Sequence, residues 1–160
     1  MVAQLSIARC ILEDPDEEFV PSWRITTPEG RYSVYTPFDN DEPEQRARAL
    51  LLVSRFMTWK MATSFVLTAK TWIGSQETRQ VDEAILVIGV SRQERLGVMQ
   101  RIEEQDPLRL GPPEWLRADQ IDETYIDLLP GKTSEITVEE IAELTEVFGD
   151  GGEMAAERMS

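Results

Sequence analysis

The side chains best suited to chemistry in this sequence are carboxylates, because the usual catalytic groups are missing. The 160 residues include no histidine and a single cysteine, Cys10. This composition excludes Ser-His-Asp and Cys-His catalysis, zinc sites that need imidazole, and paired-cysteine redox or metal motifs. No complete catalytic or nucleotide-binding motif is present. We therefore expect no cofactor and no metal, and we favour a protein that is not an enzyme.

The most interesting carboxylate pair is Asp82-Glu83, which stands at the start of a strongly apolar segment. A hairpin would place this pair opposite Lys70 and Trp72. Carboxylates in unlike environments can divide acid and base roles, or bind a divalent cation. In the alternative interpretation both acids are solvated where the hairpin meets the surface, and Glu83 is paired with Lys70. We favour this alternative, because a perturbed site needs burial that a sequence does not show.

Gly131-Lys132-Thr133 has the ending of a phosphate-binding P-loop. The full motif needs a glycine five residues before Gly131, so that backbone N–H groups can wrap the phosphates. That position is Ile126, and the acids nearby would repel phosphate. A Pro-Gly turn is the better interpretation.

Acidic residues are concentrated near the C-terminal end. The formal net charge is -14, and residues 133–160 contribute eight acids and one base, which is half of it. Binding of nucleic acid phosphates depends on Lys and Arg, so direct nucleic acid binding is not expected. A halophilic source would also explain the acidity, and would then say nothing about function.

Glu139, Glu143 and Glu146 follow i, i+4, i+7 spacing and would share one face of a helix. Like charges at this spacing destabilise a helix by about a few tenths of a kcal/mol per pair. The face is therefore either simply solvated or a docking surface for a basic partner. That partner could be Arg46 and Arg48 of another copy, or a separate protein.

Hydrophobic periodicity and turn residues predict the element order α-β-β-α-β-β-β-(β)-α. The fold class is α+β, with a mainly antiparallel sheet of about five strands packed against a long central helix. The predicted helices cover 2–13, 41–60 and 137–148, and the predicted strands cover 22–27, 31–37, 65–73, 84–90, 95–103 and a short stretch at 124–129.

One domain accounts for this length. Residues 1–131 would form the α+β core and residues 132–150 an acidic C-terminal helix packed on or beside it. Residues 151–160 would form a disordered tail.

The helix at 41–60 has more apolar surface than one sheet can cover. Leu52, Phe56 and Trp59 form a stripe separate from the one that would face the sheet. A helix that is apolar almost all round must be covered on two sides. Exposed apolar patches normally mark interfaces, in which Trp and Phe are frequent. Self-association through this stripe and cover by another helix of the same chain stay open as alternatives.

Part of the sequence resembles a scattered group of uncharacterised bacterial and phage proteins, and the resemblance rests on Phe56-Met57, Trp59-Lys60, Phe65-Val66, Trp72 and Glu83-Ala84. It covers about the middle third of the chain and implies no chemistry. The element order also shares part of the layout of deaminase-like and JAB-peptidase-like folds. Their zinc ligands include histidines, which are absent here, so no activity can be carried over.

These features favour a small acidic cytoplasmic domain that acts as a non-enzymatic protein-interaction or self-associating module. We expect a homodimer through Leu52, Phe56 and Trp59, with a basic protein as a second partner. One alternative is a carboxylate-dependent enzyme or divalent-cation-binding protein using Asp82 and Glu83. A further alternative is an acidic inhibitor of a nucleic-acid-binding protein. The lone cysteine and the lack of about 20 uncharged apolar residues favour a cytosolic protein without a membrane span.

Overall fold

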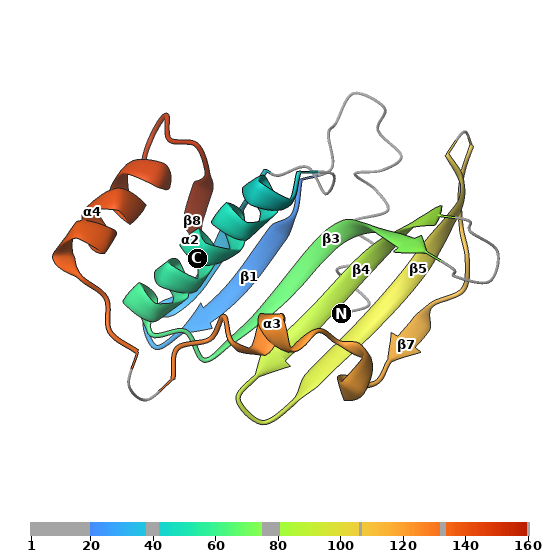
Figure 1. Ribbon diagram of the computed structural model, residues 1–160, viewed down its shortest axis with the longest axis horizontal. Coiled ribbons are helices and arrows are strands. Elements are labelled where there is room, and N and C mark those ends of the chain that lie inside the picture. Colours follow the sequence, from blue (N-terminus) through green and yellow to red (C-terminus); the bar gives the residue numbers. More distant parts are fainter. Residues whose placement is uncertain (1–19, 38–41, 75–80, 106, 132–133, 160) are drawn as a thin grey trace.

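The computed structural model describes residues 20–37, 42–74, 81–105, 107–131 and 134–159 (Figure 1). The predicted helix at 2–13, with Cys10, and the residues Lys132 and Thr133 lie outside this part of the chain.

An antiparallel sheet of eight strands forms the body of the described structure. The strand order is β6-β5-β4-β3-β1-β2-β8, and β7 also pairs with β5. The strands are β1 (Ser22–Thr27), β2 (Gly30–Tyr35), β3 (Ser64–Gly74), β4 (Val81–Ser91), β5 (Arg95–Gln105), β6 (Leu108–Leu110), β7 (Glu114–Leu116) and β8 (Ala155–Met159).

The helices lie toward one face of this sheet (Figure 1). Helix α2 (Pro43–Lys60) lies over β1, α3 (Glu123–Ile126) lies near β4, and α4 (Val138–Val147) lies beside α2 at the β8 side. A short 3-10 helix, η1 (Ala118–Gln120), precedes α3.

The predicted hairpin at residues 22–37 is present, and its tight turn has a local chemical cause. Thr27 pairs with Gly30 across a two-residue turn. The Thr27 hydroxyl donates to the Gly30 carbonyl at 2.9 Å and accepts from the Glu29 N–H at 3.2 Å. Gly30 has φ of 140°, a backbone conformation that favours glycine. The turn therefore needs the residue types that the sequence supplies.

The prediction of an α+β fold with a mainly antiparallel sheet is confirmed, whereas its detail was wrong in two respects. The sheet has eight strands rather than about five, and α2 lies over one side of it rather than at its centre. Strands β6 and β7 have three residues each, which is too short for a period-two pattern to show. The strand predicted at 124–129 is helical at its start, because the Asp122 carboxylate accepts from the Thr124 N–H and caps α3.

The expectation of a disordered tail at 151–160 was also wrong, because Ala155–Met159 form β8. This strand pairs with β2 from Tyr35↔Ala155 to Arg31↔Met159. Glycines make the reversal from α4 possible: a Cβ on Gly149 would lie 2.5 Å from the Thr145 carbonyl oxygen. The tail is ordered by backbone pairing to β2, which its side-chain pattern does not reveal.

The core lies between the sheet and the helices. Trp23 and Ile25 of β1 and Phe65 of β3 are buried in the same cluster as Val53 and Met57 of α2. On another side of α2, the Phe56 ring lies 5.2 Å from the Phe148 ring that follows α4, and 5.5 Å from Tyr32 of β2. Leu144 of α4 belongs to this cluster and has an exposed fraction of 0%. Helix α4 therefore covers the side of α2 that the sheet leaves free.

Replacing Leu144 with alanine tests whether α4 provides this cover. We expect Leu144→Ala to lower the free energy of unfolding by about 2–5 kcal/mol, the usual range for a buried leucine. Val138→Ala on the same helix is the control, since Val138 is 79% exposed and such a change should stay within about 0.5 kcal/mol. Urea unfolding followed by circular dichroism measures both. Equal effects of the two substitutions would contradict the packing of α4.

Candidate functional site

The chain itself covers the stripe that was expected to form a homodimer interface. Leu52 and Phe56 have exposed fractions of 1% and 2%. Trp59 is half-buried, its ring is 6.0 Å from Phe56, and the Lys60 ammonium lies 3.9 Å from its ring centre. The premise of an uncovered stripe was therefore wrong, and these residues belong to the core instead of a docking surface.

The three acids expected to form a docking face all lie exposed on α4, but one of them has an internal partner. Glu143 Oε2 lies 3.2 Å from Nη1 of Arg55 on α2, and the same arginine binds Glu140 at 2.8 Å. Within the described residues, Glu139 and Glu146 form no ion pair. The face is thus partly neutralised by α2.

Arg46 and Arg48, which were considered as the basic partner of this acidic face in another copy, also form contacts within the chain. Arg48 Nη1 lies 2.6 Å from Glu153 Oε2, in the segment between α4 and β8. Arg46 donates to the Tyr125 hydroxyl at 3.2 Å. Arg46, Arg48 and Arg55 thus connect α2 to α3, to the segment before β8 and to α4.

Of the carboxylate pair at the start of β4, the structure describes the side chain of Glu83 alone. Glu83 Oε2 lies 2.7 Å from Lys70 Nζ, which agrees with the ion pair that the sequence favoured. The side chains of Trp72 and Asp82 lie outside the described residues. No group of three or more possible metal-binding side chains occurs in the described part of the chain.

The residues around Gly131 form a turn. The Gly131 N–H donates to the Ser134 hydroxyl at 2.8 Å, and the Ser134 N–H donates to the Gly131 carbonyl at 3.2 Å. This agrees with the interpretation of a Pro-Gly turn, although Lys132 and Thr133 lie outside the described residues.

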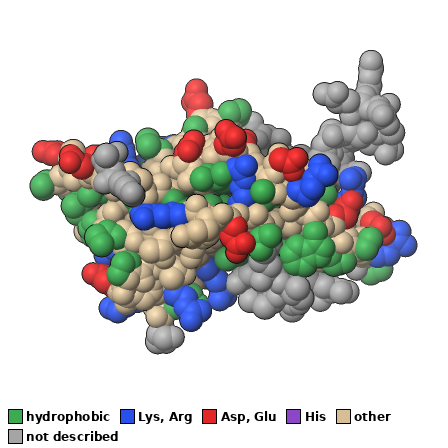
Figure 2. Space-filling model, turned by 90° about the horizontal axis from the view of Figure 1, so that it is seen from below, with side chains coloured by type: hydrophobic (Ala, Val, Ile, Leu, Met, Phe, Trp, Pro, Cys, Tyr) green, Lys and Arg blue, Asp and Glu red, His purple; other side chains and the backbone are tan. Residues whose placement is uncertain are grey.

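The surface charge is mixed on the face seen from below. Figure 2 shows acidic and basic side chains close to one another, with hydrophobic side chains scattered among them. This face does not present the continuous acidic surface that a mimic of nucleic acid would need. The alternative of an acidic inhibitor stays a prediction.

Strand β8 forms an edge of the sheet, which the sequence did not indicate. The Thr36 N–H donates to the Pro21 carbonyl at 3.1 Å. The backbone N–H and C=O groups of the even-numbered residues at this end of β2 therefore point toward β1. In an antiparallel ladder the bonding side alternates, so the odd-numbered residues of β2 bond toward β8. By the same alternation, the backbone groups of Ala156 and Arg158 face away from β2. No strand of the described chain pairs with that outer side.

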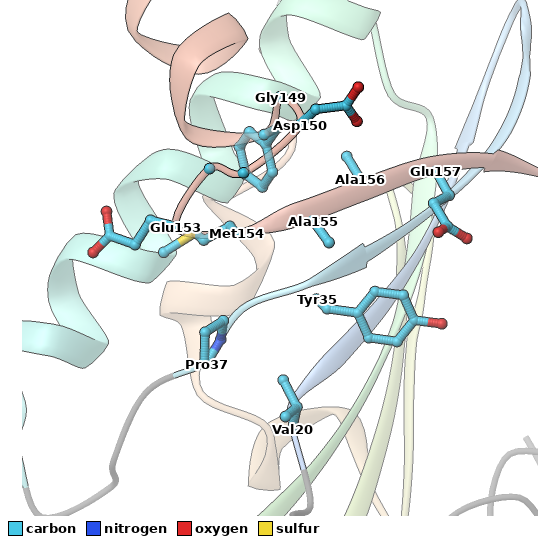
Figure 3. Close-up of a pocket in the computed structure, with 13 residues that line it drawn as sticks. Val20, Tyr35, Pro37, Gly149, Asp150, Glu153, Met154, Ala155, Ala156 and Glu157 are labelled. Carbon is cyan, nitrogen blue, oxygen red and sulfur yellow. The ribbon is translucent and has the colours of Figure 1, made fainter.

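A pocket of about 440 Å³ opens where β8 begins (Figure 3). Its lining includes Tyr35 at the end of β2, Asp150 in the glycine-rich turn, and Ala155 and Glu157 of β8. Tyr35 is 40% exposed. Neither Asp150 nor Glu157 forms an ion pair within the described residues, and no Lys or Arg lines the pocket. The arrangement offers carboxylates, an aromatic ring and, within the described residues, backbone groups without a strand partner, all of which can contact a cationic ligand.

The first turn of α4 contains a carboxylate whose pKa is shifted. A backbone hydrogen bond from Thr137, an interaction with its side chain and the charge of Arg55 lower the pKa of Glu140 below its ordinary value of 4.5. Its folded-state pKa is depressed, so its contribution to stability is fully present above the unfolded-state pKa. That contribution is lost as the pH falls through the folded-state pKa.

We therefore expect Glu140→Gln to be less stable than the parent at pH 7, and the difference to vanish as the pH falls through the folded-state pKa, which lies below 4.5. Glutamine keeps an oxygen that can accept from the Thr137 N–H, so the substitution isolates the charge. Urea unfolding at a series of pH values measures this. A difference that does not change with pH would contradict the assigned role of the carboxylate.

No helix in the described residues has both the length and the apolar character needed to cross a membrane. Comparison with known proteins finds no family model, no curated protein and no solved structure that matches the chain.

Proposed function

We propose that this protein is an interaction module that binds an extended, positively charged segment of a partner protein along the outer side of β8. The observation that supports the proposal is the edge of β8, where the backbone groups of Ala156 and Arg158 face outward beside Glu157, which forms no ion pair within the described residues. Edge strands of this kind accept an additional strand, with main-chain hydrogen bonds supplying affinity.

The opposite edge of the sheet is much less suited to accept a strand. Strand β6 has three residues, and its pairing with β5 is interrupted between Ile102 and Glu104. Prolines flank it at positions 107, 112 and 113. Natural sheets protect their edges with short strands, irregular pairing and proline, because each of these opposes further pairing. Of the strands β6 and β8, β8 is the one without a proline in or next to it.

The acidic charge near β8 indicates which kind of partner segment would bind there. The acids of this region that form no ion pair within the described residues are Glu139, Glu146, Asp150 and Glu157. Arg158 is the base of β8, and its guanidinium donates to the Glu29 carbonyl at 2.6 Å. Pairing β8 with β8 of a second copy would place the acids of two copies in one interface, and like charges at an interface oppose binding. A basic segment is therefore the better occupant.

The edge can be tested with a fluorescent heptapeptide of alternating Arg and Val. We expect binding at low ionic strength, weakened by added salt because the contact is partly electrostatic. Ala156→Pro should weaken binding by about tenfold or more, since proline has no N–H, while β8 keeps its bonds to β2. Ala156→Ser retains the N–H and is the matched control. Fluorescence anisotropy gives the dissociation constants, and thermal melts show whether each variant is folded.

A change in the probe makes the test independent of how well the proline variant folds. Two versions of the peptide carry N-methyl groups on alternate backbone amides, so that in one of them the methyl groups face β8. One version should lose binding and the other should keep it. Equal binding of both versions would overturn strand addition. A dimer, measured by light scattering, that Ala156→Pro dissociates would overturn the choice of a basic segment as the occupant of the edge.

A further inference from the structure

Resting on the proposed function, we infer that the pocket at the start of β8 receives an arginine side chain of the added segment. The guanidinium passes over Ala155 and lies against Tyr35, beside the carboxylate of Glu157. Ala155 therefore decides which position of the partner segment must be arginine.

The register of the sheet supplies the geometry for this contact. Tyr35 pairs with Ala155, and Ser33 pairs with Glu157. Directly paired residues of an antiparallel ladder share a face, so Tyr35, Ala155 and Glu157 lie on the same face. Figure 3 shows the Tyr35 ring and the Glu157 carboxylate on the same side of β8, with Asp150 on the opposite side. Tyr35, Ala155 and Glu157 therefore bound the space on one face of β8, and Asp150 lines the pocket from the other face.

The small side chain of Ala155 leaves the way into that space open. Neighbouring strands are separated by about 4.8 Å, so a residue of the added strand opposite Ala155 would lie about 10 Å from the backbone of Tyr35. The Tyr35 side chain extends into part of that distance, and a long side chain from the added strand can cover the rest. A larger residue at position 155 would occupy the path.

The lining of the pocket matches the chemistry of arginine. Carboxylates form the strongest hydrogen bonds with a guanidinium, whose several donors can reach two acceptors, and a tyrosine ring attracts a cation over its face. Glu153 also lines the pocket but is already paired with Arg48. Val20, Pro37 and Met154 offer apolar surface for the arginine methylenes. Nothing in this lining favours an anionic ligand.

Closing the path over Ala155 is the most direct experiment, using the full chain and the alternating Arg-Val peptide. Ala155→Leu should weaken binding by about tenfold. Ala142→Leu places the same substitution on an exposed position of α4 and should bind like the parent. In the parent, exchanging the peptide's arginines one at a time for neutral citrulline should reveal one dominant position. In Ala155→Leu that dominance should disappear.

A charge-matched pair of variants separates the pocket from the general acidity. Glu157→Gln should weaken binding of the parent peptide by about tenfold, and should lessen the effect of the dominant citrulline exchange. Glu146→Gln removes the same charge from α4 and should weaken binding much less.

The outcomes distinguish the pocket from the edge. Unchanged binding by Ala155→Leu, with binding still lost in Ala156→Pro, would overturn the arginine pocket while leaving strand addition in place. Equal losses in the two charge-matched variants would likewise overturn the pocket. Binding that survives Ala156→Pro and both N-methylated probes would overturn the proposed function itself.

Discussion

The two-sided burial of α2 is the constraint on which the rest of the structure depends. The Phe56 ring lies where β2, α2 and the end of α4 meet, in contact with Tyr32, Trp59 and Phe148. Without α4, one side of α2 would be exposed. The ion pairs of Arg55 and Arg48 with this region are partly exposed, and such pairs contribute about 0–1 kcal/mol each. Apolar packing therefore holds α4 in place, and the position of α4 in turn brings the chain back to β2.

Elements whose side chains carry a strong pattern could be predicted from the sequence. The helix at 41–60, the hairpin and the three long strands follow from period and turn residues, and the unbroken apolar run of β4 correctly indicated a strand in the sheet interior. Ile85 and Val87 are buried on one face of β4 and Ile88 on the other. Strand β8 escaped prediction because its five residues lack an apolar alternation, and its conformation comes from pairing with β2.

The candidate site was harder to predict, because it depends on which segments of the chain are neighbours in space. The sequence correctly showed that α2 is apolar on two sides, but whether a second copy or its own chain covers Leu52 and Phe56 is a tertiary property. The ion pair of Lys70 with Glu83 could be anticipated from a hairpin register. The pocket could not, since it joins Tyr35 to residues more than a hundred positions later, each of them unremarkable in its own segment.

The pairing of β2 with β8 has a consequence for biosynthesis. Arg158 reaches the carbonyl of Glu29, a residue 129 positions earlier in the chain. A ribosome must therefore complete almost the whole of this sequence before the first hairpin obtains its second neighbour. Contacts between such distant segments form slowly, and strand edges that wait for them are open to wrong pairing. The edge of β2 that pairs with β8 therefore waits for its partner strand until translation has passed Met159.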